Sequence, residues 1–209
     1  MSEPDEITDM RQLSANIRAI QQALGHLVMT WNHVDQSLVE LMGAALKQDP
    51  RSLSIITAHM SSEGRIQALL ACLSEMEESD IGTHIRWACN YTDRLRIWRN
   101  HYVHSVLGNY ASEGGGELRA MTYSMKAKRT VVERRIPASE ADLMKVAGQA
   151  ATLHNFIFSL CLFIRIQNQP ELRPQLWHPD IPYKLPAMPP LPERWEDYLQ
   201  AQSAHRPPR

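Results

Sequence analysis

The sequence predicts a mainly α fold, in which an antiparallel helical bundle carries a small β-hairpin before its last long helix and a proline-rich arm after it. Apolar residues recur at alternating steps of three and four, which is the pattern of amphipathic helices. That pattern lapses at about 117–136, where Thr, Val, Tyr and Met alternate with Lys and Arg. Ten of the 13 prolines fall within 170–209. We therefore expect the bundle and hairpin over 1–169 and the arm over 170–209.

The first predicted helix has a narrow apolar stripe from Ile17 to Ala45. The stripe is sustained over about four heptads, as in a coiled-coil seam, so this face is expected to pack inside a bundle or against a second protomer. Asp49-Pro50 is a stop-and-turn signal, so the helix should end near Lys47. The stripe consists of Ile17, Ile20, Leu24, Leu27, Trp31, Val34, Leu38, Leu41 and Ala45.

Two helical stretches follow before the hairpin. Residues 51–78 read as a short helix and a longer one, because Ser61–Gly64 interrupts the pattern. The next helix begins near Ile81 or Thr83. Its core positions are Ile81, Ile85, Ala88, Tyr91, Leu95, Trp98 and Tyr102.

The hairpin is expected to pair 118–127 with 130–136 across a turn at Lys128-Arg129. Ser139 and Asp142 form a capping box that opens a last helix of about 28 residues. Its inward positions are Leu143, Val146, Ala150, Leu153, Phe156, Ile157, Leu160 and Ile164.

The proline density of the arm excludes a regular core element. Trp177 and Trp195 indicate that the arm is fixed on the bundle or on a partner, because free tails are poor in tryptophan. The segment PERWEDYLQAQ predicts a short terminal helix.

Charge is segregated although the formal net charge is −1. Residues 1–83 hold 5 Lys/Arg against 12 Asp/Glu, whereas residues 84–135 hold 10 against 4. The basic segment either attracts phosphate or simply neutralises the acidic one across the fold.

The three cysteines, Cys72, Cys89 and Cys161, sit apart in apolar helical contexts and form no CxxC, which indicates buried free thiols in a reducing compartment. The acidic N-terminus is not a signal peptide, and no apolar run approaches a membrane span, since the longest, 156–166, is broken by Ser159 and Arg165. We therefore expect a cytoplasmic protein without membrane association.

The stretch WRNHYVHS, residues 98–105, gathers the side chains of phosphodiester chemistry. Cleavage of RNA without a metal needs a group that titrates near neutral pH, which His104 supplies, and a fixed cation on the scissile phosphate, which Arg99 supplies. Asn100 can orient the phosphate or the helix end. On an ideal helix Arg99 lies about 140° from His104, so within one chain the two do not meet unless the helix end unwinds.

The Arg-Asn-x-x-x-His pattern resembles the signature of HEPN-domain ribonucleases. The resemblance covers roughly 14–168 and includes a long first helix with a Trp and acidic residues (WNHVDQSLVE), a hairpin and a long final helix. It implies a homodimer that brings two motifs together and metal-independent endoribonuclease activity on RNA. It also implies a toxin of a toxin–antitoxin pair with a cognate antitoxin protein, or a phage-defence protein. Some members only bind RNA or nucleotides.

The predicted site follows from the motif and the resemblance together. By resemblance Glu40, or else Asp35, orients Arg99 or His104 from a facing helix. No cofactor or metal is expected, and the histidines outside the motif are assigned to core or surface. The predicted site residues are Arg99, Asn100 and His104 as catalytic, Glu40 and Asp93 as supporting acids, and Arg96, Lys126, Lys128 and Arg129 as RNA-binding.

Three alternatives stay open at this point. Arg99 can serve as a structural bridge to Glu40 or Asp93, while Asn100 and His104 cap the helix. The basic hairpin can be an edge strand guarded by Lys and Arg. The whole chain can be a non-catalytic interaction or RNA-binding protein that uses its helical seam and arm.

Overall fold

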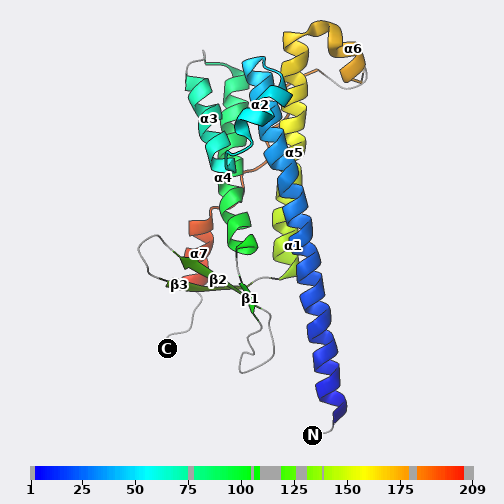
Figure 1. Cartoon of the computed structure of the whole chain (residues 1–209), viewed down its shortest axis with the longest axis vertical. Helices are drawn as coiled ribbons and strands as arrows, with labels where there is room; N and C mark the ends of the chain where they lie inside the picture. The colour runs from blue at the N-terminus through cyan, green and yellow to red at the C-terminus, as the bar shows by residue number, and fades with distance from the viewer. Residues whose placement is uncertain are drawn as a thin grey trace. The chain divides into compact units, whose positions relative to one another are not determined.

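The computed structural model describes residues 3–74, 78–104, 106–108, 119–125, 131–137, 139–178 and 183–204. Over these residues the chain is mainly helical (Figure 1), which confirms the predicted mainly α class. The chain divides into two compact units. Unit 1 comprises Met1–Thr30 and Ile97–Gly148, and unit 2 comprises Trp31–Arg96 and Gln149–Arg209.

The first helix, α1, spans Glu3–Leu46 and so begins ahead of the apolar stripe. It ends where the sequence predicts. Lys47 takes a left-handed backbone conformation with φ 54°, and the backbone N–H of Gln48 donates to the carbonyl of Gly43 at 2.9 Å. This six-to-one bond is the Schellman closure of a helix C-terminus.

Two helices follow, α2 (Pro50–Thr57) and α3 (Ser62–Ser74), which confirms the predicted interruption. The carboxylate of Asp49 caps α2 by accepting from the backbone N–H of Ser52 at 3.2 Å. Two backbone hydrogen bonds lower the pKa of the Asp49 carboxyl below its usual value of 3.8. The bond from Ser52 has the larger effect and the bond from Arg51 the smaller one. The Ser61 hydroxyl plays the same part for α3 by accepting from the N–H of Gly64 at 3.1 Å.

The helices of unit 2 do not alternate in direction throughout. Helix α4 (Asp80–Val103) runs opposite to α5 (Glu140–Asn168), because Tyr91 lies beside Gln149 and Trp87 beside Phe156. Helix α4 also runs opposite to α3, as the ion pair of Arg96 with Glu63 and the approach of Gly82 to Leu73 show.

Helices α1 and α5 run parallel. Ser37 meets His154, and farther along both helices Asn168 donates to the carbonyl of Ala44 at 3.4 Å. The prediction of an antiparallel bundle is therefore wrong for α1, α3 and α5, which share one direction. The short helix α2 is the reason, because it reverses the chain before α3 begins.

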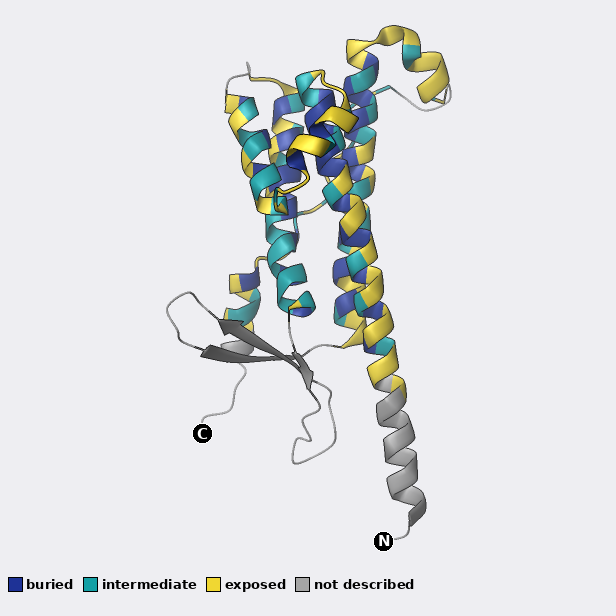
Figure 2. Cartoon of the chain, viewed as in Figure 1, coloured by how far each residue is buried: buried dark blue, intermediate teal, exposed yellow. Residues whose placement is uncertain are grey.

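The predicted apolar stripes form the core (Figure 2). Buried side chains of unit 2 include Trp31, Val34, Leu38, Leu41, Leu69, Ile85, Tyr91, Leu95, Leu153, Phe156, Ile157 and Leu160, and those of unit 1 include Ile20, Leu27, Trp98, Tyr102, Leu143 and Val146. Ile17 departs from the stripe, since it is 37% exposed.

The described residues of unit 1 include three short strands: β1 (Val106–Gly108), β2 (Arg119–Met125) and β3 (Val131–Pro137). They pair antiparallel in the order β1-β2-β3. Tyr123 lies opposite Glu133 in the register of β2 with β3. The turn predicted at Lys128-Arg129 lies outside the described residues.

Helix α5 opens with the predicted capping box. The Ser139 hydroxyl accepts from the N–H of Asp142 at 3.1 Å, and the Asp142 carboxylate accepts from the N–H and the hydroxyl of Ser139 at 3.1 and 2.7 Å. This confirms the box, with Asp in place of the usual Glu or Gln.

Among the described residues one helix, α5, is long and apolar enough to cross a membrane by length and composition, and 50% of its apolar window is buried inside the protein. The sequence-based prediction considered only the run 156–166, which Ser159 and Arg165 interrupt. An average over 18 residues tolerates isolated polar residues, which is why α5 passes this test.

The arm contains a 3₁₀ turn (Pro170–Leu172), α6 (Arg173–Leu176) and α7 (Trp195–Ala204). Within unit 2, the Tyr183 hydroxyl donates to the carbonyl of Phe163 at 3.0 Å, and Nη1 of Arg94 donates to the carbonyl of Pro192 at 3.2 Å. Trp195 is 3% exposed. Tyr183 and Pro192 therefore fix the arm to α5 and α4 of its own unit, whereas α6 is exposed.

Candidate functional site

The predicted motif occupies the last turn of α4, in unit 1. Trp98 and Tyr102 are buried, and their rings stack with centroids 6.4 Å apart. These two aromatic side chains fix the inner side of the helix end. Arg99 and Asn100 are consequently half-buried, and His104 is exposed in the turn that follows the helix.

Arg99 and Asn100 are joined directly. Nη1 of Arg99 donates to Oδ1 of Asn100 at 2.9 Å, and Nε of Arg99 is buried. Neighbouring side chains on a helix ordinarily point apart, so this bond draws the guanidinium sideways along the helix surface. Asn100 thus limits the orientations open to the planar fork of Arg99.

His104 lies one turn beyond Asn100. Its backbone N–H donates to the carbonyl of Asn100 at 3.1 Å, which continues the helical spacing to the end of the motif. The His104 side chain makes no hydrogen bond with any residue that the structure describes, as the wheel geometry predicts for Arg99 and His104 in one chain. An exposed imidazole of this kind is open to proton exchange with a bound ligand.

Arg96, predicted to contact RNA, is already engaged in unit 2. Its Nη2 lies 2.7 Å from Oδ1 of Asp93, and its Nη1 lies 3.2 Å from Oε2 of Glu63. Asp93, predicted as a supporting acid, is therefore the partner of Arg96. An RNA phosphate at Arg96 would have to compete with two carboxylates.

Glu40, the other supporting acid, is half-buried in unit 2. Its charge acts on the buried thiol of Cys161. Burial raises the pKa of Cys161 to about 12, with Arg165 opposing that shift and Glu40 adding to it. The remaining predicted RNA-binding residues, Lys126, Lys128 and Arg129, lie outside the described residues.

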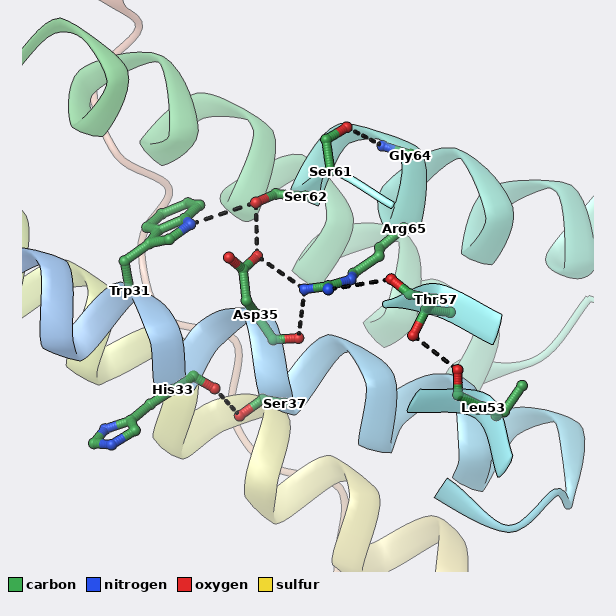
Figure 3. Close-up of polar contacts among 10 residues, drawn as sticks. All are labelled: Trp31, His33, Asp35, Ser37, Leu53, Thr57, Ser61, Ser62, Gly64 and Arg65. Carbon is green, nitrogen blue, oxygen red and sulfur yellow. Dashed lines mark hydrogen bonds and ion pairs between the residues drawn. The ribbon is translucent and has the colours of Figure 1, made fainter. Parts of the chain in front are cut away.

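The best-connected polar cluster was not singled out from the sequence (Figure 3). Oδ1 of Asp35 accepts from the Ser62 hydroxyl at 2.6 Å and lies 3.5 Å from Nη1 of Arg65. Arg65 also donates to the backbone carbonyls of Asp35 and Thr57, both at 3.3 Å, and Trp31 donates its indole N–H to Ser62 at 3.4 Å. The cluster ties α1 to the start of α3.

This cluster is structural in character, because Oδ1 and the backbone carbonyl of Asp35 are both engaged by partners of the same unit. The only sequence signal for it was Asp35 itself, weighed as an acid for the catalytic motif. Ser62 lies in the stretch Ser61–Gly64 that the sequence marks as a helix break, where capping alone would explain a serine, and Arg65 follows it directly.

Among the described residues, no group of three or more His, Cys, Asp and Glu side chains is arranged to hold a metal ion. Burial raises the pKa of Cys89 to about 12, so neither buried thiol is a nucleophile at neutral pH. Comparisons of the chain with protein-family models, with curated proteins and with solved structures gave no match.

Proposed function

We propose that the chain is a metal-independent endoribonuclease of toxin or phage-defence type. The observation that carries the proposal is the guanidinium of Arg99, held by Asn100 one turn before the exposed His104. A positioned cation and an exposed imidazole suit phosphodiester cleavage, which requires charge stabilisation and proton transfer.

In the proposed reaction the 2′-oxygen of RNA attacks the adjacent phosphorus and the P–O5′ bond breaks. The 2′-hydroxyl loses its proton and the departing 5′-oxygen gains one, so the products are a 2′,3′-cyclic phosphate and a 5′-hydroxyl. Arg99 binds the non-bridging phosphate oxygens, for which its planar fork is suited. His104 either accepts the proton of the 2′-hydroxyl or donates a proton to the departing 5′-oxygen, and Asn100 positions Arg99.

One His104 serves one proton transfer at a time. A site that needs an acid and a base together would draw the second imidazole from a second copy of the chain, which is our reason for proposing a homodimer. The basic hairpin formed around β2 and β3 would add phosphate contacts through Lys126, Lys128 and Arg129. A cytoplasmic location and a cognate antitoxin belong to the same proposal.

The experiment is cleavage of total cellular RNA by purified full-length protein in excess EDTA. Wild type is compared with Arg99→Ala and His104→Ala, and with His101→Ala as a control in the same helix turn. We expect wild type and His101→Ala to cleave and the other two variants to lose at least a hundredfold in rate. An oligonucleotide with a single 2′-O-methyl group should resist cleavage at that position.

Equal cleavage by all four proteins would reveal a contaminating nuclease and reject the proposal. Wild-type activity that EDTA abolishes would reject a metal-independent reaction. Circular dichroism of each variant separates loss of chemistry from loss of fold.

A second function, a non-catalytic interaction protein, is favoured by a different observation. Ile55 and Ile56 are adjacent on α2 and 77% and 71% exposed. Large apolar side chains exposed side by side are typical of protein–protein contacts. Binding of RNA without cleavage, or no interaction with RNA at all, would move the proposal to this class.

A further inference from the structure

Two histidines that lie 121 positions apart in sequence come together on α1 and α5 of unit 2. The ring centroids of His33 and His154 are 5.5 Å apart, with the ring planes inclined by 41°. His33 is exposed and His154 is half-buried. Neither residue belongs to the proposed ribonuclease site, and their spacing in sequence gave no sign of the pair.

A buried serine holds one of the two rings. The Ser37 hydroxyl lies 2.8 Å from the backbone carbonyl oxygen of His33 and 2.6 Å from Nδ1 of His154. Ser37 is 4% exposed, so its hydroxyl depends on these partners rather than on water.

One assignment of protons satisfies both contacts of the Ser37 hydroxyl at once. In that assignment the single Ser37 proton goes to the carbonyl oxygen of His33, which can only accept. Nδ1 of His154 then carries the proton that it donates to Ser37. In the neutral ring this leaves the lone pair on Nε2, the nitrogen that is not bonded to Ser37.

The contact with Ser37 gives His154 one feature of metal-bound histidines. Such histidines almost always donate the second ring N–H to an oxygen, which orients the ring and raises its basicity as a ligand. Two imidazoles bound to one ion at 2.0–2.1 Å and at a tetrahedral angle place their centroids roughly 5 Å apart. The observed 5.5 Å lies close to that separation. Neither nitrogen of His33 makes a hydrogen bond within the part of the chain that the structure describes.

We infer that His33 and His154 form a two-histidine site for a borderline divalent cation, such as Zn²⁺ or Ni²⁺, with Ser37 as the residue that positions His154. Imidazole nitrogen suits these ions, whereas Mg²⁺ and Ca²⁺ prefer oxygen. Two protein ligands leave the other coordination positions to water or to an exogenous donor. The site is therefore open and exchangeable, unlike a closed four-ligand structural site.

The test is isothermal titration of Ni²⁺ and of Zn²⁺ into tag-free, full-length protein that has been stripped with a chelator and dialysed. The proteins are wild type, His33→Ala, His154→Ala, the double variant and Ser37→Ala. His59→Ala is the matched control, because His59 is also exposed in unit 2 but lies outside the pair. All are made in a Cys72→Ser background, since Cys72 is the one cysteine among the three that is not buried.

We expect one ion per chain, affinity at least tenfold weaker in each single histidine variant, and an unchanged affinity in His59→Ala. Ser37→Ala should bind more weakly than the control while keeping both ligands. The visible spectrum of the Co²⁺ complex should show nitrogen ligation that is lost in the double variant. Equal affinities of wild type and the double variant, or no heat of binding at millimolar Ni²⁺ and Zn²⁺, would overturn the inference. Neither result bears on cleavage in EDTA, which tests the ribonuclease proposal separately.

Discussion

Asn100 accepts a 2.9 Å hydrogen bond from Nη1 of the residue before it, Arg99. This contact between sequence neighbours makes Asn100 a positioning residue in the proposed site. The guanidinium keeps its charge without Asn100, but it loses the acceptor that limits its orientation.

Replacing Asn100 by Ala should lower the rate of RNA cleavage roughly tenfold, well short of the loss in Arg99→Ala. The Michaelis constant should change little, because the charge that attracts the phosphate remains. Asn100→Asp should restore the contact to Arg99 but weaken RNA binding, since a carboxylate repels phosphate. Steady-state kinetics on one defined RNA separates these effects. An Asn100→Ala enzyme that is as fast as wild type would show that the bond has no part in catalysis.

The Asp35–Arg65 cluster predicts a pronounced loss of stability. The two side chains are 26% and 15% exposed, and Nε of Arg65 is buried without a hydrogen-bond partner among the residues that the structure describes. Asp35→Ala leaves the guanidinium without its counter-charge, so the free energy of unfolding should fall by about 2 kcal/mol. Urea denaturation of the purified variant measures this fall in the free energy of unfolding.

A second variant tests the cause. Arg65→Met removes the buried charge, so the double variant Asp35→Ala/Arg65→Met should be more stable than Asp35→Ala alone. If the two substitutions are additive, the ion pair is not the source of the loss. Glu63→Ala, in the exposed bridge to Arg96, should cost little by comparison.

The sequence was a good guide wherever a local pattern decides the structure. Three-four spacing located the helices, and the Ser139–Asp142 box and the Asp49-Pro50 stop were read correctly, because capping depends on neighbours in sequence. The relative direction of the helices could not be predicted in this way. The direction of α3 relative to α1 depends on the path that the chain takes through α2, and no pattern within α1 or α3 specifies that path.

The residue types of the candidate site could be predicted from the sequence, but only some of the contacts that these residues make could be. The motif named Arg99, Asn100 and His104, and the pair of Asp93 with Arg96 joins residues three positions apart on one helix. Glu63 as a second partner of Arg96, and the meeting of His33 with His154, are contacts between separate helices. Such contacts depend on how helices rotate about their axes when they pack, which a single sequence does not specify.

The end of α1 predicts opposite effects for two substitutions. Lys47 adopts φ 54°, a conformation that costs a residue with a Cβ atom roughly 1 kcal/mol, so Lys47→Gly should stabilise the protein by about that amount. A Cβ at Gly43 would lie 3.0 Å from Cγ of Pro50 and 3.1 Å from the carbonyl oxygen of Gln48. Gly43→Ala should therefore destabilise the protein by roughly 1–3 kcal/mol despite the better helix propensity of alanine.

Thermal and urea unfolding of these two variants provide the measurement, with Gly25→Ala as control. A Cβ at Gly25 meets nothing within 4 Å, so alanine there should raise stability through helix propensity alone. Stabilisation by Gly43→Ala would contradict the close packing of the α1 end against Pro50.

The thiols predict a pH dependence that can be assigned to residues. Burial raises the pKa of Cys89 and of Cys161 to about 12 from 9.0, so the folded state favours the protonated thiol more than the unfolded state does. The resulting contribution to stability is complete below pH 9.0 and is lost as the pH rises toward 12.

At pH 8 the thiolate fraction of such a group is roughly 10⁻⁴, so iodoacetamide should modify Cys72 alone until the protein unfolds. Mass spectrometry of native and urea-treated protein counts the adducts, and Cys89→Ala should reduce the loss of stability between pH 9 and 12. Rapid labelling of Cys89 or Cys161 in the native state would mean that local opening, rather than the packed helices, governs these thiols.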